Sequence, residues 1–259
     1  MGEIDSRIED GVATVTLSNP PLKNAISSSM WIALARILHT LGEDPGLRCI
    51  ILGGASGNFA SGADIGEFRV LHGTREAARN YHEAIIAPAL EAISACQHPT
   101  IAAIEGVCVG GGLEIACCCD LRICGESARL GVPINRLGFA MAPYELESLI
   151  ALAGKATALE LLLEGGLLNA SQALAKNLVT RVVPDNRVAL ETWESARRIA
   201  RGAPLAARIN KCLARRLGSQ KLPLDADEIA FAFSYAESAD HLEGVSAFLE
   251  GREPRFTGT

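Results

Sequence analysis

The chain lacks any apolar run long enough to cross a membrane, because none reaches the roughly 18 residues that a bilayer requires. Its first residues, Met1-Gly2-Glu3-Ile4-Asp5, have neither the basic start and apolar core of a signal peptide nor the Arg-rich, acid-poor composition of a transit peptide. We therefore expect a cytoplasmic protein without a membrane partner.

Positive charge is also scarce. The 24 basic residues are outnumbered by 30 acidic ones, which gives a net charge of −6. A broad nucleic-acid surface needs a basic excess, so nucleic acid is not an expected partner. An anionic small molecule needs only a local basic patch and stays compatible with this balance.

Metal-ligand spacing is missing as well. The eight cysteines contain no paired C-x-x-C motif of the zinc type, and the five histidines are scattered. Adjacent cysteines on a helix point in different directions, so the run at 117–119 is a poor chelator. We expect no metal site, and we expect reduced cysteines that are buried as small apolar residues.

The chain has no low-complexity segment, no convincing repeat and no stretch that resembles an inter-domain linker. Its 259 residues are 49% hydrophobic, which is enough for one large core. Up to Pro143, short strand-like runs alternate closely with helical patterns, and this indicates βα units and an α/β fold. Beyond Pro143 the pattern is nearly all helical, apart from a short strand at 178–183.

Periodicity and capping residues give the expected elements. The helix over 76–96 contains Pro88, where a kink is expected. Residues 65–71 are expected to form a short helix or a lid. Strands are predicted in a pair within 4–18 and at 47–52, 100–104, 120–124 and 128–131. Further helices are predicted at 28–41, 187–201, 203–217 and 226–249, the last with a break near Ser238.

The stretch from Ile104 to Ala116 is the strongest candidate for chemistry. It reads as the end of a strand, a loop with Gly110-Gly111-Gly112, and the first turn of a helix. Glycine lets a substrate approach the backbone closely, and the first N–H groups of a helix have no internal partner. Glu114, three residues after Gly111, places a carboxylate beside these donors.

A second loop of small residues follows another strand-like run. Phe59-Ala60-Ser61-Gly62-Ala63-Asp64-Ile65 comes after Cys49-Ile50-Ile51-Leu52, and again it can expose a backbone N–H. Each loop alone is also compatible with an ordinary tight turn. Together they predict two donors to one oxyanion.

These motifs resemble those of the crotonase superfamily, the enoyl-CoA hydratase/isomerase family. The resemblance runs in the family's order from about residue 10 to residue 256. Beyond the two loops, the matching pieces are Ser18-Asn19-Pro20-Pro21-Leu22-Lys23-Asn24-Ala25, Asp120, Leu130-Gly131-Val132-Pro133, Leu137-Gly138 and Glu243-Gly244-Val245-Ser246-Ala247-Phe248-Leu249-Glu250.

The resemblance implies an architecture and an assembly. It implies a crotonase-type ββα superhelical spiral over residues 1–200 that carries the acyl-CoA site. Residues 201–259 are then a C-terminal helical region that builds a homotrimer or a dimer of trimers. It also implies no bound cofactor, with coenzyme A present only as part of the thioester substrate.

The resemblance also implies roles for individual residues. The N–H groups of Ala63 and Gly111 correspond to the oxyanion hole, and Glu114 corresponds to the first catalytic glutamate. Residues expected along the acyl-CoA, in addition to those two donors, are Asp64, Ile65, Gly66, Gly110 and Tyr144. Lys23 and Phe248, and with less support Arg252, are expected near the nucleotide.

Two positions depart from the family pattern. The second glutamate of typical hydratases falls on Ile134, which cannot transfer a proton. The usual paired glycines near the acyl group are replaced by Tyr144 and Glu145, so either side chain is a candidate for the lost acid. The simpler explanation for Glu145 is that it lies in a first helical turn and interacts favourably with the helix dipole. Tyr81 and His82 are candidates for lining the acyl pocket.

Three hypotheses follow for the function. The first is an enoyl-CoA hydratase-like lyase in which an oxyanion hole stabilises the enolate and Glu114 is the acid/base group. The second is an enoyl-CoA isomerase or an acyl-CoA decarboxylase on the same scaffold. The third is a weakly active acyl-CoA-binding protein, motivated by the loss of an acid at Ile134.

Overall fold

The structure is a computed structural model that describes residues 2–219 and 223–259. Within these ranges the strands form a six-stranded sheet in the order β1-β2-β3-β4-β6-β9 and a three-stranded sheet in the order β5-β7-β8. Only β1 runs antiparallel in the large sheet. The strands are β1 (Glu3–Glu9), β2 (Val12–Ser18), β3 (Cys49–Gly54), β4 (Thr100–Ile104), β5 (Val107–Val109), β6 (Leu121–Gly125), β7 (Arg129–Gly131), β8 (Leu168–Asn169) and β9 (Arg181–Val183).

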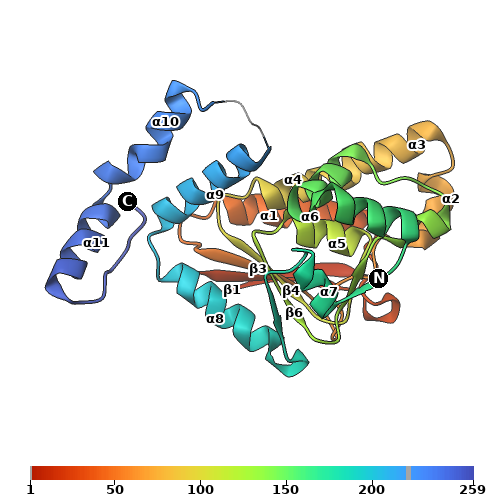
Figure 1. The fold of residues 1–259 in the computed structure, drawn as a ribbon, viewed down its shortest axis with the longest axis horizontal. Coiled ribbons are helices and arrows are strands. Elements are labelled where there is room, and N and C mark those ends of the chain that lie inside the picture. The colour runs from red at the N-terminus through yellow and green to blue at the C-terminus, as the bar shows by residue number, and fades with distance from the viewer. Residues whose placement is uncertain (1, 220–222) are drawn as a thin grey trace.

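Helices cover the large sheet and extend beyond it (Figure 1). They are α1 (Ser28–Gly42), α2 (Phe68–Leu71), α3 (Arg75–Asn80), α4 (Ala87–Ser94), α5 (Gly111–Cys118), α6 (Pro143–Glu164), α7 (Ala170–Ala175), α8 (Val188–Ala200), α9 (Pro204–Ser219), α10 (Ala226–Phe233) and α11 (Ala239–Glu250). The α/β class predicted from the sequence is confirmed.

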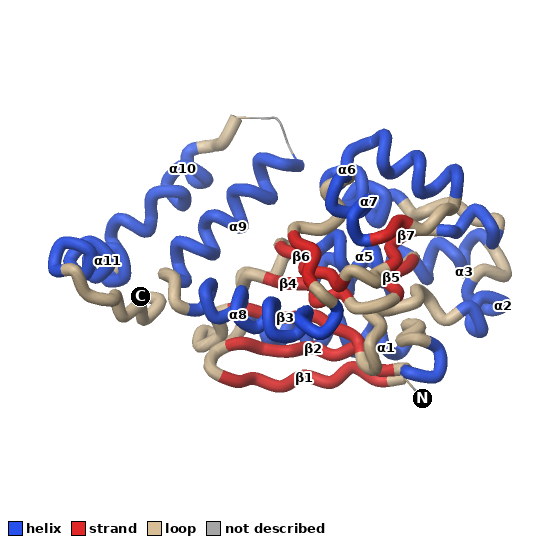
Figure 2. Tube along the Cα trace, turned by 60° about the horizontal axis from the view of Figure 1, so that its bottom comes forward, coloured by secondary structure: helices blue, strands red, loops and turns tan. Residues whose placement is uncertain are grey.

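The centre of the large sheet is covered on both faces. Successive residues of a strand point to opposite sides, and in β3 the residues of both sides are buried. Ile50 and Leu52 of β3 belong to the main apolar cluster, which includes the buried residues of α1. Cys49 and Ile51 belong to a second cluster that includes buried residues of α8. Figure 2 shows α8 lying against this sheet. A near-continuous apolar run such as Cys49-Ile50-Ile51-Leu52 is typical of a strand covered on both sides.

The helix predicted over 76–96 is a composite. A π-helical turn, Tyr81–Ile86, separates α3 from α4. The Ala87 N–H donates to the His82 carbonyl five residues back, directly before Pro88. Proline removes one i→i−4 hydrogen bond, and the wider turn accommodates that loss. The expected kink at Pro88 is therefore an inserted π turn that changes which way residues 81–86 face.

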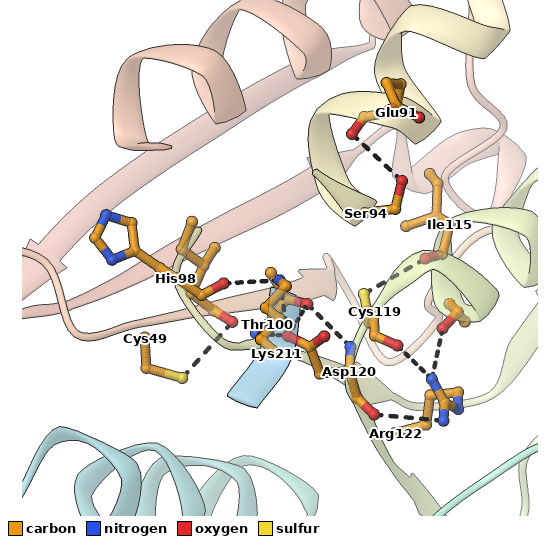
Figure 3. Close-up of polar contacts among 12 residues, drawn as sticks. Cys49, Glu91, Ser94, His98, Thr100, Ile115, Cys119, Asp120, Arg122 and Lys211 are labelled. Atoms are coloured by element: carbon orange, nitrogen blue, oxygen red, sulfur yellow. Dashed lines mark hydrogen bonds and ion pairs between the residues drawn. The ribbon is translucent and has the colours of Figure 1, made fainter. Parts of the chain in front are cut away.

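Helices α9, α10 and α11 form an arm at one end of the molecule, coloured blue in Figure 1. The side chain of Lys211 on α9 ties this arm to the core. Its Nζ lies 2.8 Å from Asp120 Oδ2 and donates to the His98 carbonyl at 2.9 Å. Asp120 in turn accepts from the Thr100 N–H at 2.7 Å (Figure 3). The break predicted near Ser238 is confirmed, since Ser238 caps α11.

The small sheet is the main element that the sequence did not predict. Strands β5 and β8 are three and two residues long, too short to show a period.

Among the described residues, no helix is both long and apolar enough to cross a membrane.

Candidate active site

The first backbone donor lies in the loop after β3. The Ile26 N–H donates to the Gly62 carbonyl at 2.8 Å, and the Asp64 N–H donates to the Ile26 carbonyl at 2.9 Å. This parallel bridge holds the residues on either side of Ala63. The Ala63 N–H itself has no acceptor among the described residues. It is thus held rigidly with its hydrogen-bonding capacity unused.

The second donor lies where β5 passes into α5. Gly110 has φ 53° and ψ −121°, a conformation that glycine alone adopts without strain. Its N–H donates to the Gly131 carbonyl at 2.9 Å. The helix begins at the next residue, so the Gly111 N–H has no acceptor in the described part of the chain.

The two donors converge. A Cβ atom placed on Gly111 would lie 3.6 Å from the Ala63 nitrogen and 2.8 Å from the Trp31 ring. A Cβ placed on Gly62 would lie 3.5 Å from the Gly111 nitrogen. The absence of a side chain at both glycines is what lets the loops approach this closely. Two unpaired N–H groups therefore face one small volume, which is the arrangement that stabilises an oxyanion.

A cavity of about 130 Å³ opens at these donors. Its lining is mostly apolar and aromatic, with Glu114, His82 and the Tyr81 phenol as its ionisable side chains. The lining residues are Trp31, Ser61, Gly62, Ala63, Ile65, Phe68, Tyr81, His82, Ile86, Val109, Gly110, Gly111, Glu114, Pro133, Ile134, Leu137 and Phe139.

Glu114 is a buried carboxyl in this cavity, with 8% of its surface exposed. Burial, and then the negative charge of Glu145, raise the pKa of Glu114 well above its ordinary value of 4.5. No cation pairs with it among the described residues. The group is therefore favoured in its protonated form and is suited to proton transfer.

Ile134 also lines the cavity and is 8% exposed. The position that carries a second carboxylate in typical family hydratases is thus an apolar contact here. No proton can be exchanged from this part of the wall.

The two candidates for the lost acid lie in different surroundings. Glu145 is 2% exposed, its Oε1 lies 2.7 Å from His82 Nδ1, and its Oε2 accepts from the Ala142 N–H at 3.1 Å. Tyr144 instead donates its hydroxyl to Glu91. It lines a separate hollow beside α9, and it is not among the residues that line the donor cavity.

The aromatic wall of the cavity could not be assigned from local sequence. Phe68 stacks on His72 with ring centroids 4.1 Å apart, and Phe139 meets His72 edge-on at 5.2 Å. Burial, and then repulsion from His82, lower the pKa of His72. These residues come from three separate segments, so no motif joins them. Tyr81 and His82 do line the cavity, as expected for the acyl pocket.

Residues expected along the CoA are only partly brought together. Lys23 is exposed and next to the cavity mouth, because its carbonyl accepts from the Ser61 N–H at 3.0 Å. Asp64 accepts from the Gly66 N–H at 2.9 Å and so shapes the turn that presents Ile65, which is 49% exposed.

The two C-terminal candidates lie elsewhere. Phe248 is 86% exposed on α11 and lines a hollow between α9 and α11 instead of the donor cavity. Arg252 is paired with Glu243 at 2.7 Å and with Glu250 at 2.6 Å. No group of three or more potential metal ligands lies together among the described residues.

Comparison with known proteins identifies the family. The model of the enoyl-CoA hydratase/isomerase family matches residues 7–259. A Bacillus subtilis protein named "Probable enoyl-CoA hydratase" is 35% identical over 263 residues, covering 100% of both chains. The 2,3-dehydroadipyl-CoA hydratase of Escherichia coli is 31% identical, also over 100% of both.

A solved structure agrees with these matches. The structure of an enoyl-CoA hydratase/carnithine racemase from Magnetospirillum magneticum superposes with a TM-score of 0.96 at 43% identity, covering 99% of this chain and 96% of that one. The crotonase fold expected from the sequence is thereby confirmed, and the chain belongs to the enoyl-CoA hydratase/isomerase family.

Proposed function

We propose that this protein adds water across the α,β double bond of an enoyl-CoA thioester and catalyses the reverse elimination. The observation that carries the proposal is one cavity that holds a buried, protonatable carboxyl and two unpaired backbone donors. The name of the Escherichia coli relative, a hydratase of 2,3-dehydroadipyl-CoA, supports the same reaction class.

The donors act on the thioester oxygen. When water attacks Cβ, the electrons of the double bond move toward the carbonyl and an enolate forms. The Ala63 and Gly111 N–H groups stabilise the developing negative charge without reorganising. One such donor contributes about 2.7–4 kcal/mol in a hydrolase oxyanion hole.

Glu114 supplies the acid/base step. Its raised pKa favours a protonated carboxyl that gives its proton to Cα as the enolate collapses. In the reverse direction the carboxylate takes that proton back. Decarboxylation needs only the oxyanion hole, so a desolvated Glu114 supports hydration, or isomerisation by the same proton transfer, over decarboxylation and over binding alone.

Coenzyme A enters this proposal as part of the substrate, and no other cofactor is required. The exposed ammonium of Lys23, next to Ser61 at the cavity mouth, is placed to meet a phosphate of CoA. Such a contact holds the substrate without taking part in the chemistry.

The C-terminal arm, residues 201–259, is proposed to build a homotrimer or a dimer of trimers in the cytoplasm. Its exposed apolar side chains support this, among them Phe233 at 64%, Leu242 at 65%, Phe248 at 86% and Leu249 at 79%. Large exposed apolar surfaces of this kind mark association sites. Light scattering coupled to size exclusion would show three or six subunits, and a monomer would contradict the proposal.

The hydratase proposal is tested with crotonyl-CoA and purified protein. Loss of the conjugated thioester absorbance should be rapid in the wild type and fall by about 10²–10⁴-fold in Glu114→Gln, which cannot donate or accept the proton. Glu126→Gln, a change at an exposed glutamate, is the matched control and should keep the wild-type rate. Tight binding of the thioester without turnover would overturn the proposal and favour a binding protein.

A further inference from the structure

The imidazole of His82 lines the donor cavity together with Glu114 and the Tyr81 phenol. Its Nδ1 lies 2.7 Å from Glu145 Oε1, and Nε2 has no partner among the described residues. The side chain is 15% exposed, whereas that of Glu145 behind it is 2% exposed. A buried carboxylate therefore holds one ring nitrogen while the other stays available.

From this geometry we propose that His82 is the base that removes a proton from water in the hydration, with Glu145 as its positioning residue. The inference rests on the proposed function and deepens it. It assigns to His82 the proton transfer that Ile134 cannot perform. Carboxylate–histidine pairs of this kind fix the tautomer whose free Nε2 accepts a proton.

The step balances in protons and electrons. Water gives a proton to His82 Nε2 while its oxygen forms a bond to Cβ, and the double-bond electrons pass into the enolate. Glu114 then gives its proton to Cα, and the thioester carbonyl re-forms. The imidazolium returns its proton to the Glu114 carboxylate through solvent, so the enzyme is restored and the product is the 3-hydroxyacyl thioester.

Titratable groups from several elements surround the imidazole. Glu145 of α6 contacts it, and the rings of His72, which follows α2, and of Tyr81 lie with their centroids 5.3 Å and 5.4 Å from that of His82. Glu114 of α5 lines the same cavity. Oε1 of Glu145 lies 2.7 Å from the His82 ring, and the negative charge of the same carboxylate, after burial, raises the pKa of Glu114. One carboxylate thus supports both a base and an acid in the same cavity.

The position of His82 in the helix supports a functional role. His82 lies in the π-helical turn, Tyr81–Ile86, and such turns are frequent at functional sites. Glu145 also does more than favour a helix N-terminus. Its Oε2 accepts from the Ala142 N–H, and its Oε1 contacts the imidazole of His82.

The test measures the hydration of crotonyl-CoA in three variants across pH. His82→Gln keeps a hydrogen bond to Glu145 but cannot act as a base, so kcat should fall by about 10²–10⁴-fold. The fall in rate at low pH that protonation of an imidazole base imposes should also disappear. Glu145→Gln should lower kcat by about 10²-fold through misplacement of the ring. Millimolar imidazole should restore part of the rate of His82→Ala, an effect that a merely structural role would not produce.

Two exposed glutamates provide matched controls. Glu83→Gln, one residue from His82, and Glu147→Gln, two residues from Glu145, should keep the wild-type rate and pH profile. If His82→Gln keeps the wild-type rate and low-pH limb, the inference is overturned while hydration stands. An unfolded His82→Gln leaves imidazole rescue of His82→Ala to decide, and absence of rescue there counts against the inference. A wild-type protein without hydratase activity overturns both proposals.

Discussion

The cavity has two sides that are built in different ways. The donor loops, residues 59–65 and 110–114, contribute backbone N–H groups and Glu114, and each loop is one continuous stretch of chain. The His82–Glu145 pair joins side chains that are 63 residues apart in the sequence. Backbone donors are fixed by glycine packing and hydrogen bonds of the fold itself. Side-chain groups depend only on where a helix turn or a helix start places them.

This difference explains why one side keeps the family pattern and the other departs from it. Moving a backbone donor would require moving the bridge at Ala63 or the start of α5, and thereby the core. A proton-transfer group needs only to reach the same cavity. An isoleucine at position 134 is therefore tolerable if another element supplies the missing group, whereas a side chain at Gly111 is not.

The largest change in activity should come from substitutions in the donor loops. In Gly111→Ala the new Cβ would lie 2.8 Å from the Trp31 ring, so the start of α5 must shift. Loss of one aligned donor should lower kcat by about 10²–10³-fold. Gly42→Ala in α1, where a Cβ meets only Cys96 Sγ at 3.9 Å, is the control and should keep full activity. Equal activity of both variants would mean that Gly111 is not a donor.

A second prediction concerns stability and tests whether the folded protein disfavours the ionised form of Glu114. A carboxyl whose pKa is raised by folding stabilises the protein fully below its ordinary pKa of 4.5, and this contribution is lost as pH rises through the raised value. Glu114→Gln removes this titration. The free energy of unfolding of the variant should therefore rise relative to that of the wild type as pH increases from 5 to 8.

Urea unfolding at pH 5 and pH 8 checks this sign. Glu147→Gln, at an exposed position of α6, should change stability equally little at both values. A difference between Glu114→Gln and the wild type that does not depend on pH would show that the pKa of Glu114 is not raised.

The smallest effect should come from outside both sides of the cavity. Lys23→Ala removes an exposed charge at the mouth and should raise KM for CoA thioesters about 2–5-fold, the range for an exposed ion pair, with kcat unchanged. With a pantetheine thioester, which has no nucleotide, KM should be the same for both proteins. A fall in kcat would show that Lys23 contributes to the chemical step and not only to binding of the CoA moiety.

Much of the fold could be predicted because its signals are local. The apolar run at 49–52, the helical pattern at 28–41 and the break at Ser238 each predict an element from neighbouring residues, and the structure contains all three. The triple glycine likewise predicted the start of α5. Strands β5 and β8 escaped prediction because two or three residues cannot show an alternation.

The residues of the site also fall into two groups, those with a local sequence signal and those without one. Ala63, Gly111 and Glu114 lie in motifs, and the structure brings them into one cavity. Trp31 and Phe139 enter the cavity through tertiary packing, for which the sequence holds no local signal. The contact between His82 and Glu145 depends on a π turn before Pro88, and only the backbone structure shows which way that turn presents the imidazole.

The π turn also has a consequence for insertions and deletions. It holds one more residue than an α-helical turn would, and each residue of an α-helix advances the rotation by about 100°. Deleting one residue between Tyr81 and Ile86 would restore regular winding and rotate α3 and His82 together relative to α4. The buried face of α4 would stay in register with the core. Length variation in this single turn is therefore a way to aim a different side chain at an unchanged pair of backbone donors.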